Sequence, residues 1–149
     1  MTPEAQLATF LAKYTPDIRA FARAARRRMQ ARLPGAIEMV YDNYNALVIG
    51  YAPTERASDA IFSLALFPRW VTLCFLKGKG LPDPERLLKG GGARVRHIRL
   101  ENAATLDKPA VRDLMKSALE RSEKTIDAAG PRQLIIKSIS VKQRPRRPE

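Results

Sequence analysis

The chain has 149 residues, 45% of them hydrophobic, and its 27 Lys and Arg against 15 Asp and Glu give a net charge of +12. This length predicts a single domain with its own hydrophobic core. The sequence has no apolar run near the roughly 20 residues of a membrane span, and its single cysteine excludes an internal disulfide. We therefore expect a cytoplasmic protein. The basic excess favours nucleic acid or another polyanion as partner, unless the charge only reflects an arginine-rich composition.

Two helices are predicted at the N-terminus. Thr2-Pro3-Glu4 and Thr15-Pro16-Asp17 each combine a capping hydroxyl, a proline suited to the first helical position and an acid near the positive helix end. We expect the first helix to reach about Tyr14 and the second to end at Leu33. The second has a buried stripe of Ile18, Phe21, Ala25 and Met29. Its opposite side carries the first candidate anion-binding residues: Arg19, Arg23, Arg26 and Arg27.

Residues 36–100 predict an antiparallel meander. The runs "AIEMVY", "ALVIGYA", "AIFSLALFP" and "WVTLCFL" are rich in β-branched and aromatic residues and are separated by short turn signals. A helical turn, "ERLLK", and three glycines then precede a fifth strand, "RVRHIRL". A phosphate-binding loop needs the reverse order, with the glycines before a helix. We therefore interpret Gly90–Gly92 as a helix cap and turn rather than a ligand loop.

The C-terminal part predicts one more helix and an extension. Asp107 is expected to cap a helix that continues through Ile126 and stops at Gly130-Pro131. Residues 131–149 hold an apolar segment able to add a strand, then a Pro- and Arg-rich tail that we expect to be loose. Three tail arginines complete the anion-binding candidates: Arg144, Arg146 and Arg147. The element order predicts an α+β fold, in which a sheet of about five antiparallel strands packs against N-terminal and C-terminal helices in a domain of residues 1–130.

Few residues have a pattern typical of catalysis. One histidine and one cysteine give no zinc-binding spacing, and Cys74 is interpreted as a small buried hydrophobic residue. Glu38 stands inside an apolar strand, where a carboxylate needs a partner. We expect a salt bridge to an arginine of the second helix, with a carboxylate site formed with Asp42 as the alternative. The strand aromatics are interpreted as core, although aromatics on an open sheet face can bind bases.

The order of several segments resembles the YdhG-like family of bacterial domains of unknown function. The resemblance rests on "IEMVYDNYNALVIGYAPTERASDAIFSLALFPRWVTLCFL", "GLPDPERLLKGGGARVRHIRL" and "DKPAVRDLMKSALE", which cover roughly residues 36–122. It implies an antiparallel sheet packed against helices. Some members resemble frataxins and are proposed iron chaperones, a role that requires an acidic surface. This chain departs from that pattern, because arginines occupy its long helix.

Two functional hypotheses follow. The first is a non-enzymatic domain that binds an anionic partner through a basic surface, without a cofactor. The second is a small-molecule or metal pocket lined by strand residues, namely Glu38, Asp42, Tyr44 and His97.

Overall fold

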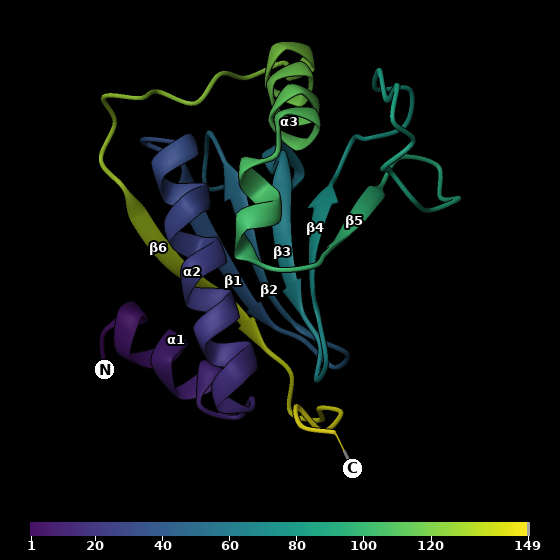
Figure 1. Cartoon of the computed structure of the whole chain (residues 1–149). Helices are drawn as coiled ribbons and strands as arrows, with labels where there is room; N and C mark the ends of the chain where they lie inside the picture. Colours follow the sequence, from purple (N-terminus) through teal and green to yellow (C-terminus); the bar gives the residue numbers. More distant parts are fainter. Residues whose placement is uncertain (149) are drawn as a thin grey trace.

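The structure, a computed structural model, describes residues 1–148 (Figure 1). No helix in this range is long and apolar enough to cross a membrane. The described residues form three α-helices, two short 3₁₀ helices and six strands. In chain order they are α1 (Pro3–Leu11), α2 (Pro16–Arg32), β1 (Ile37–Asp42), β2 (Leu47–Ala52), η1 (Ala57–Asp59), β3 (Phe62–Leu66), β4 (Val71–Phe75), β5 (Arg96–Leu100), η2 (Ala103–Asp107), α3 (Pro109–Arg121) and β6 (Gln133–Ile139).

Both N-terminal helices begin where the capping residues predict. The Thr2 hydroxyl accepts a hydrogen bond from the Ala5 backbone N–H at 3.1 Å, and Thr15 caps α2 in the same way through Ile18 at 3.4 Å. Helix α1 ends at Leu11, somewhat before the predicted end. The chain then turns to bury Tyr14, whose hydroxyl donates to the Leu66 carbonyl at 2.7 Å.

The sheet has six strands in the order β5-β4-β3-β2-β1-β6. Strands β1 to β5 form the predicted antiparallel meander. Strand β6 comes from the C-terminal extension and pairs with β1 in parallel, which makes the sheet mixed. The α+β class is therefore confirmed, with one strand more than the predicted five.

The helices cover one face of the sheet and bury the core between the two layers (Figure 1). Alternate residues of the central strands point to this face, as the two-residue period of a strand requires. Leu64 of β3 and Leu73 of β4, both fully buried, are examples. Glu38 and Asp42 lie at the same two-residue period on β1, so two carboxylates are carried into the layer between sheet and helices.

Helix α3 is shorter than predicted. It ends at Arg121, and residues 122–132 cross from its end to β6 at the edge of the sheet (Figure 1). Because β6 lies beside β1, the chain needs this extended segment to reach it. The prediction that Asp107 caps the helix is also wrong. Its carboxylate instead accepts hydrogen bonds from Arg28 at 2.9 Å and Arg32 at 3.0 Å.

The segment before β5 also differs from the prediction, because residues 85–89 form no helical turn. The Asp83 carboxylate accepts hydrogen bonds from the backbone N–H groups of Leu87 (2.9 Å) and Leu88 (2.8 Å), which offers the backbone an alternative to a helix. Lys89 forms an isolated antiparallel bridge with His97. Gly90 turns the chain with a φ of 112°, a conformation that favours glycine. The prediction of a helix cap at Gly90–Gly92 is therefore wrong, because no helix directly precedes these glycines, while Gly90 does turn the chain.

Candidate functional site

The four residues of the predicted strand pocket do not converge. Glu38 and Asp42 occupy β1, but each is bonded to a different set of side chains. Tyr44 is exposed in the turn between β1 and β2, and His97 lies on β5, four strands away from β1. Within residues 1–148 there is no group of three or more His, Cys, Asp or Glu side chains that could hold a metal ion.

Glu38 is buried and fully partnered. Its carboxylate accepts hydrogen bonds from Arg26 at 2.9 and 3.0 Å, from Gln30 at 3.0 Å and from the Tyr51 hydroxyl at 2.9 Å. Burial, together with the neighbouring Glu38 charge, raises the pKa of Tyr51 well above its ordinary value. The predicted salt bridge between Glu38 and an arginine of the second helix is confirmed. The partners of this carboxylate are all side chains of the fold itself, so its role is structural.

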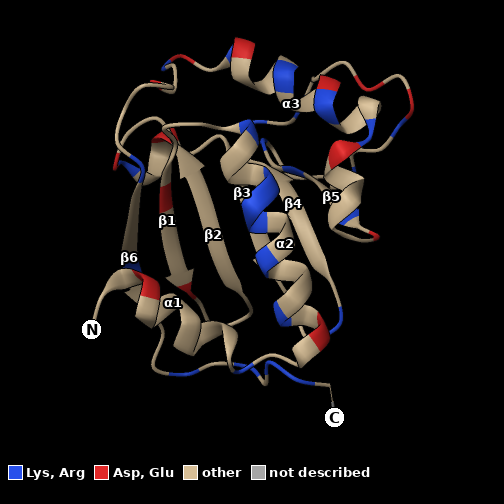
Figure 2. Cartoon of the chain, turned by 60° about the vertical axis from the view of Figure 1, so that its left-hand side comes forward, with Lys and Arg blue, Asp and Glu red and all other residues tan. Residues whose placement is uncertain are grey.

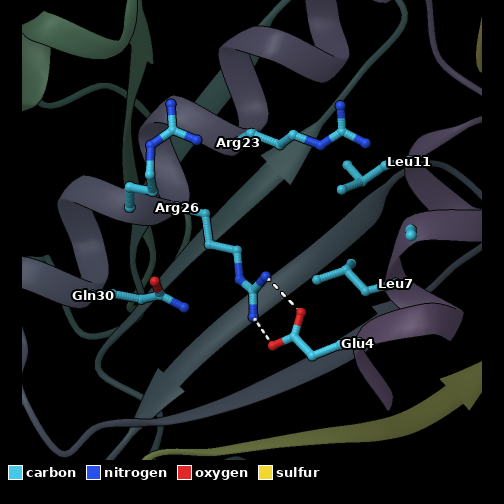
Figure 3. A pocket seen from close by; sticks show the side chains of 8 residues that line it. Glu4, Leu7, Leu11, Arg23, Arg26 and Gln30 are labelled. Atoms are coloured by element: carbon cyan, nitrogen blue, oxygen red, sulfur yellow. Dashed lines mark hydrogen bonds and ion pairs between the residues drawn. The ribbon is translucent and has the colours of Figure 1, made fainter. Parts of the chain in front are cut away.

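Arg26 is shared between two acids, so it differs from the other predicted arginines of α2. It also forms a bidentate pair with Glu4 of α1, at 2.7 and 3.0 Å (Figure 3). Burial lowers the pKa of Arg26, but hydrogen bonds to Glu4 and Glu38 outweigh this effect and raise it. The pair lines a hollow of about 240 Å³ between α1 and α2, where Arg23 and Arg27 are exposed. Arg19 is half-buried.

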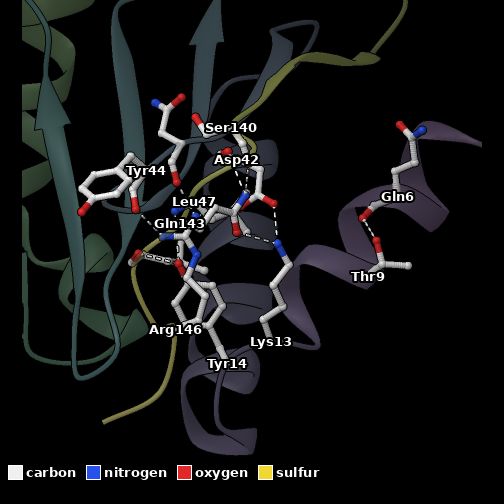
Figure 4. A network of polar contacts seen from close by, with 12 residues as sticks. Gln6, Thr9, Lys13, Tyr14, Asp42, Tyr44, Leu47, Ser140, Gln143 and Arg146 are labelled. Carbon is white, nitrogen blue, oxygen red and sulfur yellow. Dashed lines mark hydrogen bonds and ion pairs between the residues drawn. The ribbon is translucent and has the colours of Figure 1, made fainter. Parts of the chain in front are cut away.

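Asp42 forms a second buried network with the C-terminal segment, defined here as residues 140–147 (Figure 4). Its two carboxylate oxygens bind Lys13 at 2.6 Å and Arg146 at 3.0 Å. Arg146 also donates to the backbone carbonyls of Asn43 and Tyr44, and its guanidinium lies 5.9 Å from the Tyr14 ring centroid. Burial raises the pKa of Asp42, but hydrogen bonds, with Lys13 the strongest, hold it below its ordinary value.

The prediction of a loose tail is therefore wrong. The Arg146 side chain is only 3% exposed, because a buried carboxylate is available to neutralise it. Backbone bonds from Ser140 to Asp42 and from Arg144 to Tyr44, both 2.8 Å, fix the segment beside the β1–β2 turn. The side chains of Arg144 and Arg147 remain exposed. Of the three predicted tail arginines, these two can reach an external anion.

A further cluster of aromatic and basic side chains lies at the end of the sheet nearest this segment. Phe67 and Trp70 close the β3–β4 hairpin through a 2.9 Å bond from the Phe67 N–H to the Trp70 carbonyl. Their rings stack with centroids 5.3 Å apart and planes 26° from parallel. The Arg99 guanidinium of β5 lies 4.4 Å from the Trp70 ring centroid, a cation–π distance. Both rings are partly exposed, and Arg99 is exposed.

Two hollows flank this stack. The larger, about 670 Å³, is lined by Phe67, Trp70, Arg69 and the exposed arginines of the C-terminal segment. The smaller, about 400 Å³, is lined by Arg69, Trp70 and Arg99. We call the residues that carry this region the aromatic–arginine surface: Phe67, Arg69, Trp70, Arg99, Arg144 and Arg147. In Figure 2 the basic C-terminal segment follows the end of the sheet towards the C-terminus.

The charge of the aromatic–arginine surface is strongly positive. Its four arginines face one acid among the residues that line the two hollows, Glu101. Such a surface attracts anions, and its guanidinium groups match phosphate oxygens in geometry. Sequence reasoning found Arg144 and Arg147 but missed Arg69 and Arg99. It assigned Phe67 and Trp70 to the core with base stacking as the alternative, and the core assignment is wrong for these two half-exposed rings. The signal was present in "FPRW", where an arginine and a tryptophan occupy a turn, but nothing in the sequence indicated that Arg99 lies beside them.

The chain matches no protein-family model, no curated protein and no solved structure.

Proposed function

We propose that this protein is a non-enzymatic domain that binds nucleic acid through the aromatic–arginine surface. The observation that carries the proposal is the grouping of four exposed arginines around a partly exposed stack of Phe67 and Trp70. The net charge of +12 adds long-range attraction for the same class of partner.

Salt bridges distinguish the arginines of this surface from the two buried-network arginines, Arg26 and Arg146. Arg26 and Arg146 are bonded to buried acids, so their charges stabilise the fold. Arg69, Arg99, Arg144 and Arg147 are exposed and have no salt bridge within residues 1–148. Because an exposed guanidinium keeps its charge at any physiological pH, it remains available for a phosphate.

The alternative hypothesis, a small-molecule or metal pocket lined by the strand carboxylates, has less support from the contacts of Glu38 and Asp42. Glu38 and Asp42 already accept hydrogen bonds from arginine, lysine, glutamine and tyrosine side chains, so a metal ion would have to displace several of them. Membership of the YdhG-like family stays a prediction, supported by the agreement between its implied sheet-and-helix fold and the observed one. A cytoplasmic location forms part of the same proposal.

Binding is tested by fluorescence anisotropy with labelled oligonucleotides over a salt series. The variant Arg69→Ala/Arg144→Ala removes two charges from the surface, and Arg112→Ala/Lys116→Ala removes two exposed charges from α3 as a matched control. We expect the first variant to weaken binding and to reduce the slope of log affinity against log salt by about 1.4 units for single strands or 1.8 for duplex. The control should keep nearly the full slope. Equal losses in both variants, or no binding by the intact protein at low salt, would refute the proposal.

A further inference from the structure

The stack at the centre of the aromatic–arginine surface has three members and two ends. In the sheet, β4 lies between β3 and β5. Phe67 therefore approaches Trp70 from the β3 side, and Arg99 approaches it from the β5 side. In the order of the strands Trp70 therefore lies between them, and Phe67 and Arg99 are the two ends of the stack.

Each end opens into a different hollow. Phe67 lines the larger one and Arg99 lines the smaller one, while Trp70 lines both. Aromatic rings and guanidinium planes are side-chain surfaces on which proteins stack unpaired bases, and Phe67 and Arg99 supply one of each. From this geometry we infer that the partner is single-stranded nucleic acid, with one base stacked on Phe67 and another on Arg99. The inference rests on the proposed function and specifies the form of its ligand.

The arginine positions fit a strand that passes over the stack. Arg69 lines both hollows, so this residue lies between the two proposed base positions. A phosphate between the two bases would meet it there. Arg144 and Arg147 line only the larger hollow and would contact phosphates beyond the Phe67 end.

A duplex would use this surface poorly. Paired bases stack on one another and present only their edges in the grooves, so the faces of Phe67 and Arg99 would stay without a partner. Charge alone would still attract duplex phosphates, but that attraction needs no aromatic stack. Tighter binding of a strand with bases than of an abasic strand with the same phosphates therefore distinguishes this inference from simple polyanion binding.

The fluorescence of Trp70 reports ligand binding at this surface, because Trp70 is the only tryptophan of the chain. Its fluorescence is titrated with octathymidylate, with an abasic octamer that carries the same phosphates, with a short duplex and with inorganic polyphosphate. We expect octathymidylate to bind the most tightly and to change the emission the most. Parallel titrations with octauridylate compare RNA with DNA.

The variant Phe67→Leu removes the aromatic face and keeps an apolar side chain. Loss of one stacked base should weaken octathymidylate binding about 5- to 150-fold, with the abasic octamer and polyphosphate changed less than about twofold. Tyr41→Leu, which removes a half-buried aromatic from β1, is the matched control and should bind like the parent chain. Thermal unfolding of each variant verifies that it is folded.

The outcomes separate the two proposals. If the abasic octamer, the duplex and polyphosphate bind as tightly as octathymidylate, and Phe67→Leu loses nothing, the single-strand inference is overturned while polyanion binding stands. If none of the probes binds at low salt, both proposals fail.

Discussion

Replacing Arg146 with methionine tests whether the C-terminal segment is part of the folded domain. The Arg146 and Asp42 side chains are 3% and 1% exposed, and their charged atoms are 3.0 Å apart. Removing one partner of a buried ion pair costs about 3 to 5 kcal/mol, because the other charge stays buried without compensation.

Two features of the network reduce that figure. Lys13 still binds the other carboxylate oxygen of Asp42, from a position that is 41% exposed. The Arg146 Nε is buried without a hydrogen-bond partner, so its removal also relieves a cost of about 1 kcal/mol. We therefore expect Arg146→Met to lower the free energy of unfolding by about 2 to 3 kcal/mol. In a domain of this size the melting temperature should fall by about 4 to 12 °C.

Denaturant and thermal unfolding followed by circular dichroism measure the change. Arg147→Ala is the control, since that exposed side chain only donates to the backbone carbonyls of Ala12 and Lys13. It should change stability by less than about 0.5 kcal/mol. If Arg146→Met is as stable as the control, the segment contributes no stability and the reasoning is refuted.

Three further predictions concern polar side chains that are buried or half-buried. Tyr51→Phe should lower the free energy of unfolding by about 1.5 to 3 kcal/mol, because it removes a hydrogen bond to the Glu38 carboxylate. Since the pKa of Tyr51 is raised, the unfolded chain ionises first above pH 10.0, and the stability of the parent protein should fall there. Denaturant titrations should show a smaller alkaline loss of stability in this variant. The pKa of Asp42 is lowered from 3.8, so its contribution should be present above that pH and disappear as the pH falls through the folded value. Acid titration should show a shallower loss for Asp42→Asn, and an identical acid limb would contradict this. Cys74 is half-buried rather than buried as the sequence indicates. This partial burial raises the pKa of the Cys74 thiol, so a thiol reagent should label the folded protein more slowly than the unfolded chain, and equally rapid labelling would contradict this prediction.

The sequence contains the local parts of this fold more clearly than its long-range contacts. The starts of α1 and α2 are predictable because a capping threonine and the proline after it act within one helical turn. The meander is predictable because its hairpins join neighbouring runs. The parallel pairing of β6 with β1 leaves no such local signal in the sequence. The early end of α3 cannot be predicted either, because the chain leaves this helix in order to reach the edge of β1.

The site residues follow the same division. Glu38 could be recognised because an acid inside an apolar strand requires a partner, and its arginine partner was expected from the adjacent helix. The burial of Arg146 could not be recognised from the sequence, because "KQRPRRP" has the composition of a loose tail and Asp42 lies 104 residues earlier. The stack of Phe67, Trp70 and Arg99 joins a hairpin to a strand that follows after a long loop, so only the folded chain brings it together.

The parallel strand β6 has a consequence for the order of events during synthesis. Strand β1 emerges from the ribosome early and can pair at once with β2, but its other edge stays open until residues 133–139 have emerged. Until then the carboxylate of Asp42 also lacks Arg146. A nascent chain that already holds the whole meander therefore exposes an unpaired strand edge next to an incompletely neutralised acid, a form open to pairing with other chains. The domain is completed only when its last strand has emerged, so ribosome-bound chains halted just before Gln133 should be far more sensitive to protease than chains released after β6.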